Sequence, residues 1–199
     1  ILLKEYKWLK KVIKYFKINK IIYLSSPSIY YKKSIIGKVK KKCERLIFLK
    51  KKNFKFYQIW RPYNLVGKNE YLSDHFHNLA IKKFFIEKRN NYNFYGSSKD
   101  KRGYSSVSKF VKLLHKHSNY NKSFIKNYGN KDLITTFDLV NIYKKIYLEK
   151  FNREFAAKFQ SKVANVSVVN NKTNSIFSNE NSKKVIKNYI KRILNEKKM

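Results

Sequence analysis

The start of the chain alternates apolar and basic positions in a helical pattern. Between residues 2 and 16, apolar side chains recur every three or four positions with lysines between them, which predicts an amphipathic helix. Residues 21–24 are a short apolar run, which predicts a strand. A loop over residues 25–34, a lysine-rich helix over 35–49 and an alternating strand over 54–60, ended by Arg61 and Pro62, follow.

The same alternation of elements continues to the end of the chain. The patterns predict helices near residues 73–88, 107–115, 136–150 and 178–195, and strands at 92–95, 124–128 and 165–169. Helices that alternate with strands are typical of an α/β fold with a mostly parallel sheet. Because no repeat and no clear linker interrupts the pattern, we expect one domain over residues 1–199.

The net charge of the chain indicates the class of partner that it binds. The chain has 199 residues, of which 47 are Lys or Arg and 12 are Asp or Glu, giving a formal net charge of +35. A composition of 43% hydrophobic and 17% aromatic residues supplies a core. AT-rich coding accounts for the abundant Lys and Asn but not for the shortage of acids. The excess therefore predicts a polyanionic partner, nucleic acid first and an anionic membrane second, and argues against a freely diffusing metabolic enzyme.

Cysteine usage and the first residue bear on the compartment. Cys43 is the only cysteine, which excludes a disulfide framework and a cysteine-based zinc site. The chain begins at Ile1 without an initiator Met, which we interpret as a fragment or a non-standard start codon, and either fits a mitochondrial gene. No window reaches about 18 consecutive apolar residues, so no membrane span is expected.

Several motifs in order along the chain carry a family resemblance. Residues 21–30 (IIYLSSPSIY), 40–44 (KKKCE) and 60–67 (WRPYNLVG) are followed by Gly96, residues 102–107 (RGYSSV), 127–129 (NYG) and 135–140 (TTFDLV). Together they resemble the serine loop, the K-x-x-x-E helix and the R-P-x-N-x-x-G segment of the extended short-chain dehydrogenases/reductases, the NAD-dependent epimerase/dehydratase family. The resemblance covers nearly the whole chain in weak motifs.

The chain departs from the family pattern at the residues that bind the cofactor and transfer the proton. The family's G-x-x-G-x-x-G phosphate loop is absent, and the chain starts about where the family's fourth helix does. Aligning Lys40 with the lysine of the family's Y-x-x-x-K places Ile36 at the position of the proton-donating tyrosine. An isoleucine cannot transfer a proton. Of the catalytic set only Ser26 and Lys40 remain, so we expect a pseudoenzyme with no catalytic residues, no cofactor and no metal.

The resemblance implies a particular architecture. We expect a partial Rossmann-like fold whose mostly parallel sheet lacks its N-terminal dinucleotide-binding half. Residues 1–70 would be the remnant of the nucleotide fold's second half, and residues 71–199 the remnant of the substrate region. The strand from Ile21 to Leu24 would then have lost a neighbour, and an open strand edge is a template for pairing. We therefore expect another protein, or a separately encoded N-terminal half, to cover this edge.

Basic clusters supply the candidate binding residues. Few acids lie near them to form pairs, so they would repel one another unless they met phosphates. Contacts from lysine to phosphate are sequence-blind, which suits packing on folded RNA. The RNA-binding candidates are Lys38, Lys40, Lys41, Lys42, Lys50, Lys51, Lys52, Lys183, Lys184, Lys187, Lys191 and Arg192.

Aromatic residues are assigned to the core instead. Tyr6, Phe16, Phe84, Phe85 and Phe110 occupy apolar helical positions, so no stacking platform for bases is predicted.

Three functions fit these features. The first is a non-catalytic structural protein of a mitochondrial ribosome that packs its basic surface on rRNA and neighbouring proteins. The second is an accessory subunit of a mitochondrial respiratory membrane complex, with lysines facing anionic lipid. The third is the substrate half of a split NAD-dependent epimerase/reductase, to which Ile36 is the main objection.

Overall fold

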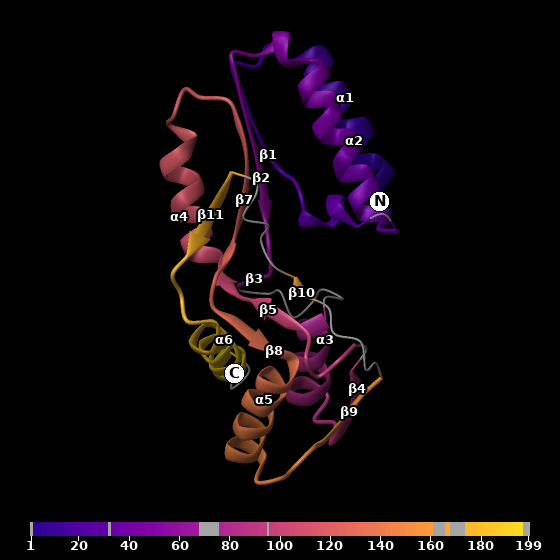
Figure 1. The fold of residues 1–199 in the computed structure, drawn as a ribbon, viewed down its shortest axis with the longest axis vertical. Coiled ribbons are helices and arrows are strands. Elements are labelled where there is room, and N and C mark those ends of the chain that lie inside the picture. The colour runs from indigo at the N-terminus through magenta and orange to yellow at the C-terminus, as the bar shows by residue number, and fades with distance from the viewer. Residues whose placement is uncertain are drawn as a thin grey trace. The chain divides into compact units, whose positions relative to one another are not determined.

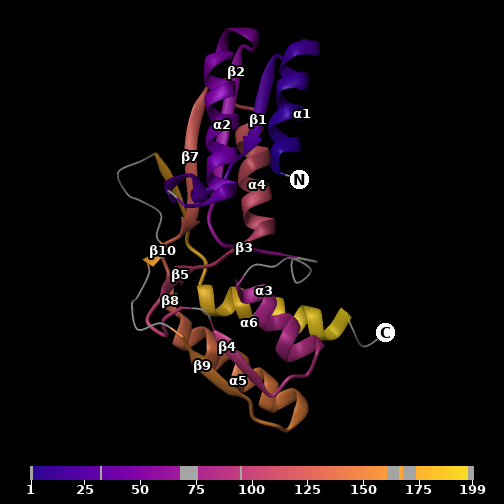
Figure 2. The same cartoon turned by 90° about the vertical axis from the view of Figure 1, so that its right-hand side faces the viewer.

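The computed structural model describes residues 2–31, 33–67, 76–94, 96–160, 166–167 and 174–196 (Figures 1 and 2). Contacts divide the chain into two compact units. Unit 1 comprises Ile1–Tyr63, Val111–Gly129 and Val169–Phe177, and unit 2 comprises Asn64–Phe110, Asn130–Val168 and Ser178–Met199. The units are interleaved in sequence.

Unit 1 is built on a four-stranded sheet in the order β1-β2-β7-β11. The strands are β1 (Lys20–Leu24), β2 (Phe56–Pro62), β7 (Phe124–Asn130) and β11 (Ser175–Ser178). The pairs β1–β2 and β2–β7 are parallel, with Ile21 opposite Tyr57 and Ile59 opposite Ile125. The predicted α/β fold with a mostly parallel, Rossmann-like sheet is confirmed. Within the described ranges β1 pairs with β2 alone, so it is an edge strand.

Helices cover both faces of this sheet. Helices α1 (Leu2–Tyr15) and α2 (Ile35–Leu49) lie side by side on one face, where Ile13, Ile47 and Ile59 are buried in one apolar cluster. The next residue along β2, Trp60, faces the other way and contacts His117 of α4 (Val107–Ser118) edge to face. This alternation follows from the pleat of a strand, whose successive side chains point to opposite faces.

Unit 2 has a separate, aromatic core. Its longest helices are α5 (Thr136–Phe151) and α6 (Ser182–Glu196), and α3 (Phe76–Ile81) continues into the π-helical turn η4 (Lys82–Ile86). Phe84 of η4 stacks on Phe155 with ring centroids 3.8 Å apart, and Tyr143 and Tyr147 of α5 pack around Phe84.

Short strands complete unit 2. They form three sheets: β10 (Val166–Ser167), β5 (Lys101–Gly103) and β8 (Leu133–Thr135); β3 (Leu65–Val66) and β6 (Ser105–Ser106); and β4 (Asn91–Phe94) and β9 (Ala156–Phe159).

Several element boundaries differ from the sequence prediction. The strand predicted to stop before Arg61 runs through Pro62, because Pro at the last position removes no N–H that the strand interior needs. The helix predicted from residue 178 begins at Ser182, since Ser178 ends β11 and the Asn181 side chain accepts a hydrogen bond from the Lys184 N–H as a helix cap.

The remaining differences are smaller. The predicted loop over 25–34 contains the 3-10 turn η1 (Pro27–Tyr30), and a second turn, η2 (Lys51–Asn53), precedes β2. Residues 73–75, 95, 165 and 168–169 of the predicted elements lie outside the described residues. None of the helices in the described part of the chain is long and apolar enough to cross a bilayer.

Candidate functional site

Two residues of the family resemblance, Ser26 and Lys40, lie at the carboxyl end of β1. Ser26 follows the strand and caps η1, accepting a hydrogen bond from the Ser28 N–H at 3.2 Å. Ile36 lies in the first turn of α2 and is 42% exposed. Lys40, one turn further along α2, reaches back to the strand and donates to the Leu24 carbonyl oxygen at 2.9 Å.

An acidic residue of α1 binds the side chain of Lys40. The Glu5 carboxylate accepts hydrogen bonds from Lys40 Nζ at 2.7 Å and from the Tyr23 hydroxyl at 2.9 Å. The Lys40 ammonium also lies 5.1 Å from the centre of the Tyr23 ring. Lys40 thus joins α2 to α1 and β1.

Titratable groups around this contact are poorly suited to chemistry near neutral pH. Burial raises the pKa of the Tyr23 phenol far above its usual value, and the hydrogen bonds to Cys43 and Glu5 raise it further. Burial also raises the pKa of the Cys43 thiol, which outweighs its hydrogen bond with Tyr23. The thiolate is the nucleophilic form of cysteine, so Cys43 stays unreactive. Within the described ranges, no three His, Cys, Asp or Glu side chains are placed to hold a metal ion.

A second network ties α2 to the carboxyl end of β2. The Arg61 guanidinium donates to both oxygens of Glu44, at 2.9 and 2.5 Å, and Ser25 donates its hydroxyl to the same carboxylate. Arg61 also donates to the Tyr30 hydroxyl at 2.6 Å, and that hydroxyl donates to Asn127 Oδ1 at 3.2 Å. Burial works to lower the pKa of Arg61, but the bonds to Glu44 outweigh it, so Arg61 stays charged.

These two networks include both acidic residues of unit 1. Its three segments contain two acidic residues, Glu5 and Glu44. Both carboxylates bind side chains of their own unit, Lys40 and Arg61. The surface cations of unit 1 are therefore left without carboxylates of the same unit to pair with.

The predicted RNA-binding residues divide between the two units. Lys38, Lys41 and Lys42 of α2 are exposed, as are Lys50, Lys51 and Lys52 at its end. Lys40 is not a surface residue, because its side chain is 18% exposed and pairs with Glu5. The remaining candidates are exposed on α6 in unit 2: Lys183, Lys184, Lys187, Lys191 and Arg192. Of these, Lys183 is paired with Asp138 at 3.0 Å.

The aromatic residues were predicted correctly in unit 2 and only in part in unit 1. Phe84, Phe85 and Phe110 are buried, and Tyr6 packs against the core of unit 1. Phe16 was predicted to be buried, but it is 67% exposed because α1 ends at Tyr15 and Phe16 no longer follows the helical stripe. Exposed Tyr15 and Phe48, at the ends of α1 and α2, were also missed.

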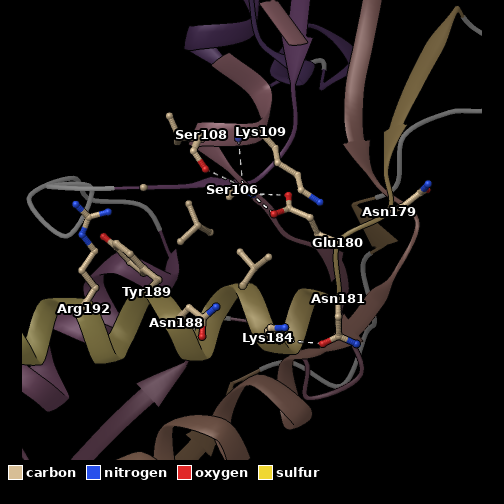
Figure 3. A pocket seen from close by; sticks show the side chains of 14 residues that line it. Ser106, Ser108, Lys109, Asn179, Glu180, Asn181, Lys184, Asn188, Tyr189 and Arg192 are labelled. Atoms are coloured by element: carbon tan, nitrogen blue, oxygen red, sulfur yellow. Dashed lines mark hydrogen bonds between the residues drawn. The ribbon is translucent and has the colours of Figure 1, made fainter. Parts of the chain in front are cut away.

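A cavity of about 780 Å³ lies in unit 2 between β3, the start of α4 and α6 (Figure 3). Glu180 is the organising residue: its carboxylate accepts from the Ser106 N–H at 2.8 Å, the Ser106 hydroxyl at 2.7 Å and the Ser178 hydroxyl at 3.0 Å. The amino end of a helix favours an anion. At the start of α4 that anion is the chain's own Glu180.

Comparison of sequences matches the chain to no family model and to no curated protein. Comparison of structures finds NAD-dependent sugar-nucleotide enzymes. MoeE5 in complex with UDP-glucose and NAD superposes with a TM-score of 0.72 at 13% identity, over 98% of this chain and 71% of that one. UDP-glucuronic acid 4-epimerase from Bacillus cereus, in complex with NAD, gives 0.67 at 17% identity, over 95% and 66%.

A third solved structure superposes with a similar TM-score. UDP-N-acetylglucosamine 4-epimerase from Methanobrevibacter ruminantium M1, in complex with UDP-N-acetylmuramic acid, has a TM-score of 0.67 at 15% identity, over 98% of this chain and 69% of that one. The chain thus spans about two thirds of the length of these enzymes. At these identities the likeness establishes the fold: this chain has the Rossmann-like fold of UDP-sugar epimerases.

Proposed function

We propose that the chain is a non-catalytic structural protein of a mitochondrial ribosome, in which an epimerase-like fold packs its basic surface on rRNA and neighbouring proteins. The observation that carries this proposal is the placement of the two acidic residues of unit 1. Glu5 and Glu44 both bind internal partners, so no carboxylate of unit 1 is left to pair with the exposed lysines of α1 and α2. A surface of this kind gains free energy by releasing counterions from a phosphate backbone.

The remnant of the family site supports a role without hydride chemistry. Ile36 offers no proton at the position where the family has its tyrosine. Lys40, which aligns with the lysine of the family's Y-x-x-x-K, is held by Glu5 and by the Leu24 carbonyl. The side chains at this position are thus engaged with one another instead of lining a site for a substrate.

The edge strand β1 supports a protein partner as well as an RNA partner. Ile22 and Leu24 are 37% and 45% exposed, although their neighbours Ile21 and Tyr23 are buried. An apolar edge of this kind pairs readily with another strand. We propose that a strand of another polypeptide in the particle lies along β1.

Salt dependence of RNA binding tests the RNA contact. The triple variant Lys38→Gln, Lys41→Gln, Lys42→Gln removes three exposed cations from α2 without touching the Lys40–Glu5 pair. We expect its slope of log affinity against log salt to be shallower by about two to three, since each phosphate contact contributes roughly 0.7–0.9. The matched control is Lys144→Gln, Lys145→Gln, Lys150→Gln, which removes three exposed lysines from α5. Equal slopes for the two triple variants would remove α2 from the interface.

Co-sedimentation from a mitochondrial detergent lysate tests the particle. We expect the protein to migrate with ribosomal particles and to leave that fraction after ribonuclease treatment. Migration with a membrane complex regardless of ribonuclease would favour an accessory respiratory subunit. Migration with a small nucleotide-binding protein, together with NAD-dependent activity, would favour the split enzyme.

A further inference from the structure

Exposed aromatic side chains gather at the amino end of the parallel sheet of unit 1. Tyr15 ends α1 and Phe16 follows it, Phe48 lies in the last turn of α2, and Tyr120 follows α4. These side chains are 68%, 67%, 50% and 42% exposed, respectively. We call these four residues the aromatic end. In Figure 1 the C-terminal ends of α1 and α2 lie together at the top, where β1 and β2 begin.

Hydrogen bonds hold the segments of the aromatic end together. The Asn19 carbonyl, three residues after Phe16, accepts from the N–H groups of Lys55 and Phe56 at 2.9 and 3.1 Å. Lys20 Nζ donates to the Ser118 carbonyl at the end of α4, at 2.7 Å. The ends of the three helices are therefore brought to one edge of the sheet by contacts within unit 1.

Lysine ammonium groups lie beside two of the rings, and the surrounding segments contain no acidic residue. Lys14 Nζ lies 4.8 Å from the centre of the Tyr15 ring, and Lys51 Nζ lies 4.8 Å from the centre of the Phe48 ring. Residues 14–20, 46–57 and 116–126 contain no Asp or Glu. Further exposed lysines in these segments are Lys17, Lys50, Lys52, Lys55, Lys116 and Lys122.

Aromatic rings interleaved with ammonium groups match a particular ligand. A single-stranded nucleic acid offers bases that stack on rings and, between them, phosphates that bind lysine. An anionic bilayer fits less well, because Tyr15 and Phe48 would lose their contacts with the ammonium groups of Lys14 and Lys51, which stay in water when a ring enters the acyl boundary. A-form duplex RNA also fits less well, since its bases are already stacked.

We propose that the aromatic end binds an unpaired stretch of RNA, with Tyr15, Phe16, Phe48 and Tyr120 stacking on bases and the flanking lysines contacting phosphates. This rests on the proposed function, in which RNA is the partner, and adds that the RNA at this end of unit 1 is single-stranded. The rRNA contact proposed for Lys38, Lys41 and Lys42 and the single-strand site at the aromatic end are then separable.

Binding of the full chain to two probes tests the proposal: a 12-nucleotide oligo-uridine and a 12-base-pair RNA duplex, each titrated at several salt concentrations. The variant Phe16→Leu, Phe48→Leu keeps apolar side chains but loses the flat rings. We expect it to weaken oligo-uridine binding by about 5-fold to 100-fold per ring lost, with an unchanged salt slope and unchanged duplex binding. The matched control Phe137→Leu removes a ring that is 56% exposed on α5, and should bind both probes like the wild type.

The other outcomes separate this proposal from the broader one. Wild-type oligo-uridine affinity in the leucine variant would overturn the stacking site but leave the rRNA contact proposed for α2 intact. Failure of the wild-type chain to bind either RNA would overturn the proposed function as well. Binding of wild type to vesicles of anionic lipid, retained by the leucine variant and stronger than to oligo-uridine, would assign the aromatic end to a membrane. Circular dichroism of each variant shows that the fold is intact.

Discussion

Glu44 of α2 and Arg61 of β2 form a two-pronged ion pair, with N–O distances of 2.9 and 2.5 Å, at the carboxyl end of the unit 1 sheet. Their side chains are 10% and 13% exposed, so the pair is mostly removed from water. The hydroxyls of Ser25 and Tyr30 bind the same two groups, which connects the end of β1, η1, α2 and β2 through one cluster.

Removing the Glu44 charge should destabilise the protein strongly, because Arg61 would be left buried without a counter-charge. We expect Glu44→Gln to lower the free energy of unfolding by about 3 kcal/mol. Urea unfolding followed by tryptophan fluorescence measures this change, since Trp60 is buried beside Arg61. The double variant Glu44→Gln, Arg61→Met should recover most of the loss, and a double variant as unstable as the single one would contradict the explanation.

Gly37 should not tolerate even one added methyl group. Its hydrogen faces the loop before α2, and a Cβ there would overlap the backbone carbonyl of Ser28. Alanine favours a helix by about 1 kcal/mol over glycine, so Gly37→Ala would be stabilising on propensity alone. We expect instead a loss of about 2 kcal/mol from the overlap, measured by urea unfolding. Lys38→Ala, at the exposed neighbouring position, is the control and should be close to neutral.

Asp138 makes the stability of α5 depend on pH. It accepts a hydrogen bond from the Thr135 hydroxyl at 2.8 Å and one from Lys183 Nζ at 3.0 Å, which lowers its pKa below the usual value. A carboxyl with a lowered pKa stabilises the fold fully above its unfolded pKa of about 3.9, and this contribution is lost as pH falls through the folded pKa. We expect Asp138→Asn to unfold at a lower temperature than wild type at pH 6, and the two melting temperatures to converge near pH 2. A difference in melting temperature that persists at pH 2 would show that the loss of stability does not come from the charge of Asp138.

The outer edge of β1 should be open in the isolated chain and closed in the particle that we propose. In a parallel sheet, alternate N–H groups of an edge strand point away from their one neighbour. Hydrogen–deuterium exchange should therefore be fast for about half of the amides of β1 in the purified protein and slow in the particle. Amides of the central strand β2 are the internal control. Equally fast exchange of β1 in the particle would leave the edge without a partner strand.

Long amphipathic elements could be predicted from the sequence, and short ones could not. The boundaries of α2 at Ile35 and Leu49 agree with the prediction, because an apolar stripe over fifteen residues is a strong signal. Strands β3 and β6, of two residues each, pair only through tertiary contacts and have no periodicity of their own. Strand β11 was assigned in part to the last helix, since Ser-Asn-Glu-Asn carries polar residues that suit a helix start.

The candidate site was predictable in its family remnants but not in its pairing. The spacing of Ser26, Ile36 and Lys40 is a property of the sequence, whereas the contact from Glu5 to Lys40 joins residues 35 positions apart. The composition shows that acidic residues are scarce, but it does not show that the two in unit 1 pair with side chains of their own unit. The sequence also does not show which side chains are exposed at the end of a helix. Phe16 continues the apolar periodicity of α1, but the helix ends at Tyr15.

Interleaving of the two units has a consequence for the order in which the protein folds during synthesis. The sheet of unit 1 takes β1 and β2 from the first third of the chain, β7 from the middle and β11 from residues 175–178. When β1 and β2 have been translated they can pair with each other, but β7, the second partner of β2, has not yet been made. Closure of the sheet must wait for the last segments, and contacts this distant in sequence form slowly. The nascent chain thus presents the lysine-rich helices α1 and α2 before the sheet beside them is complete.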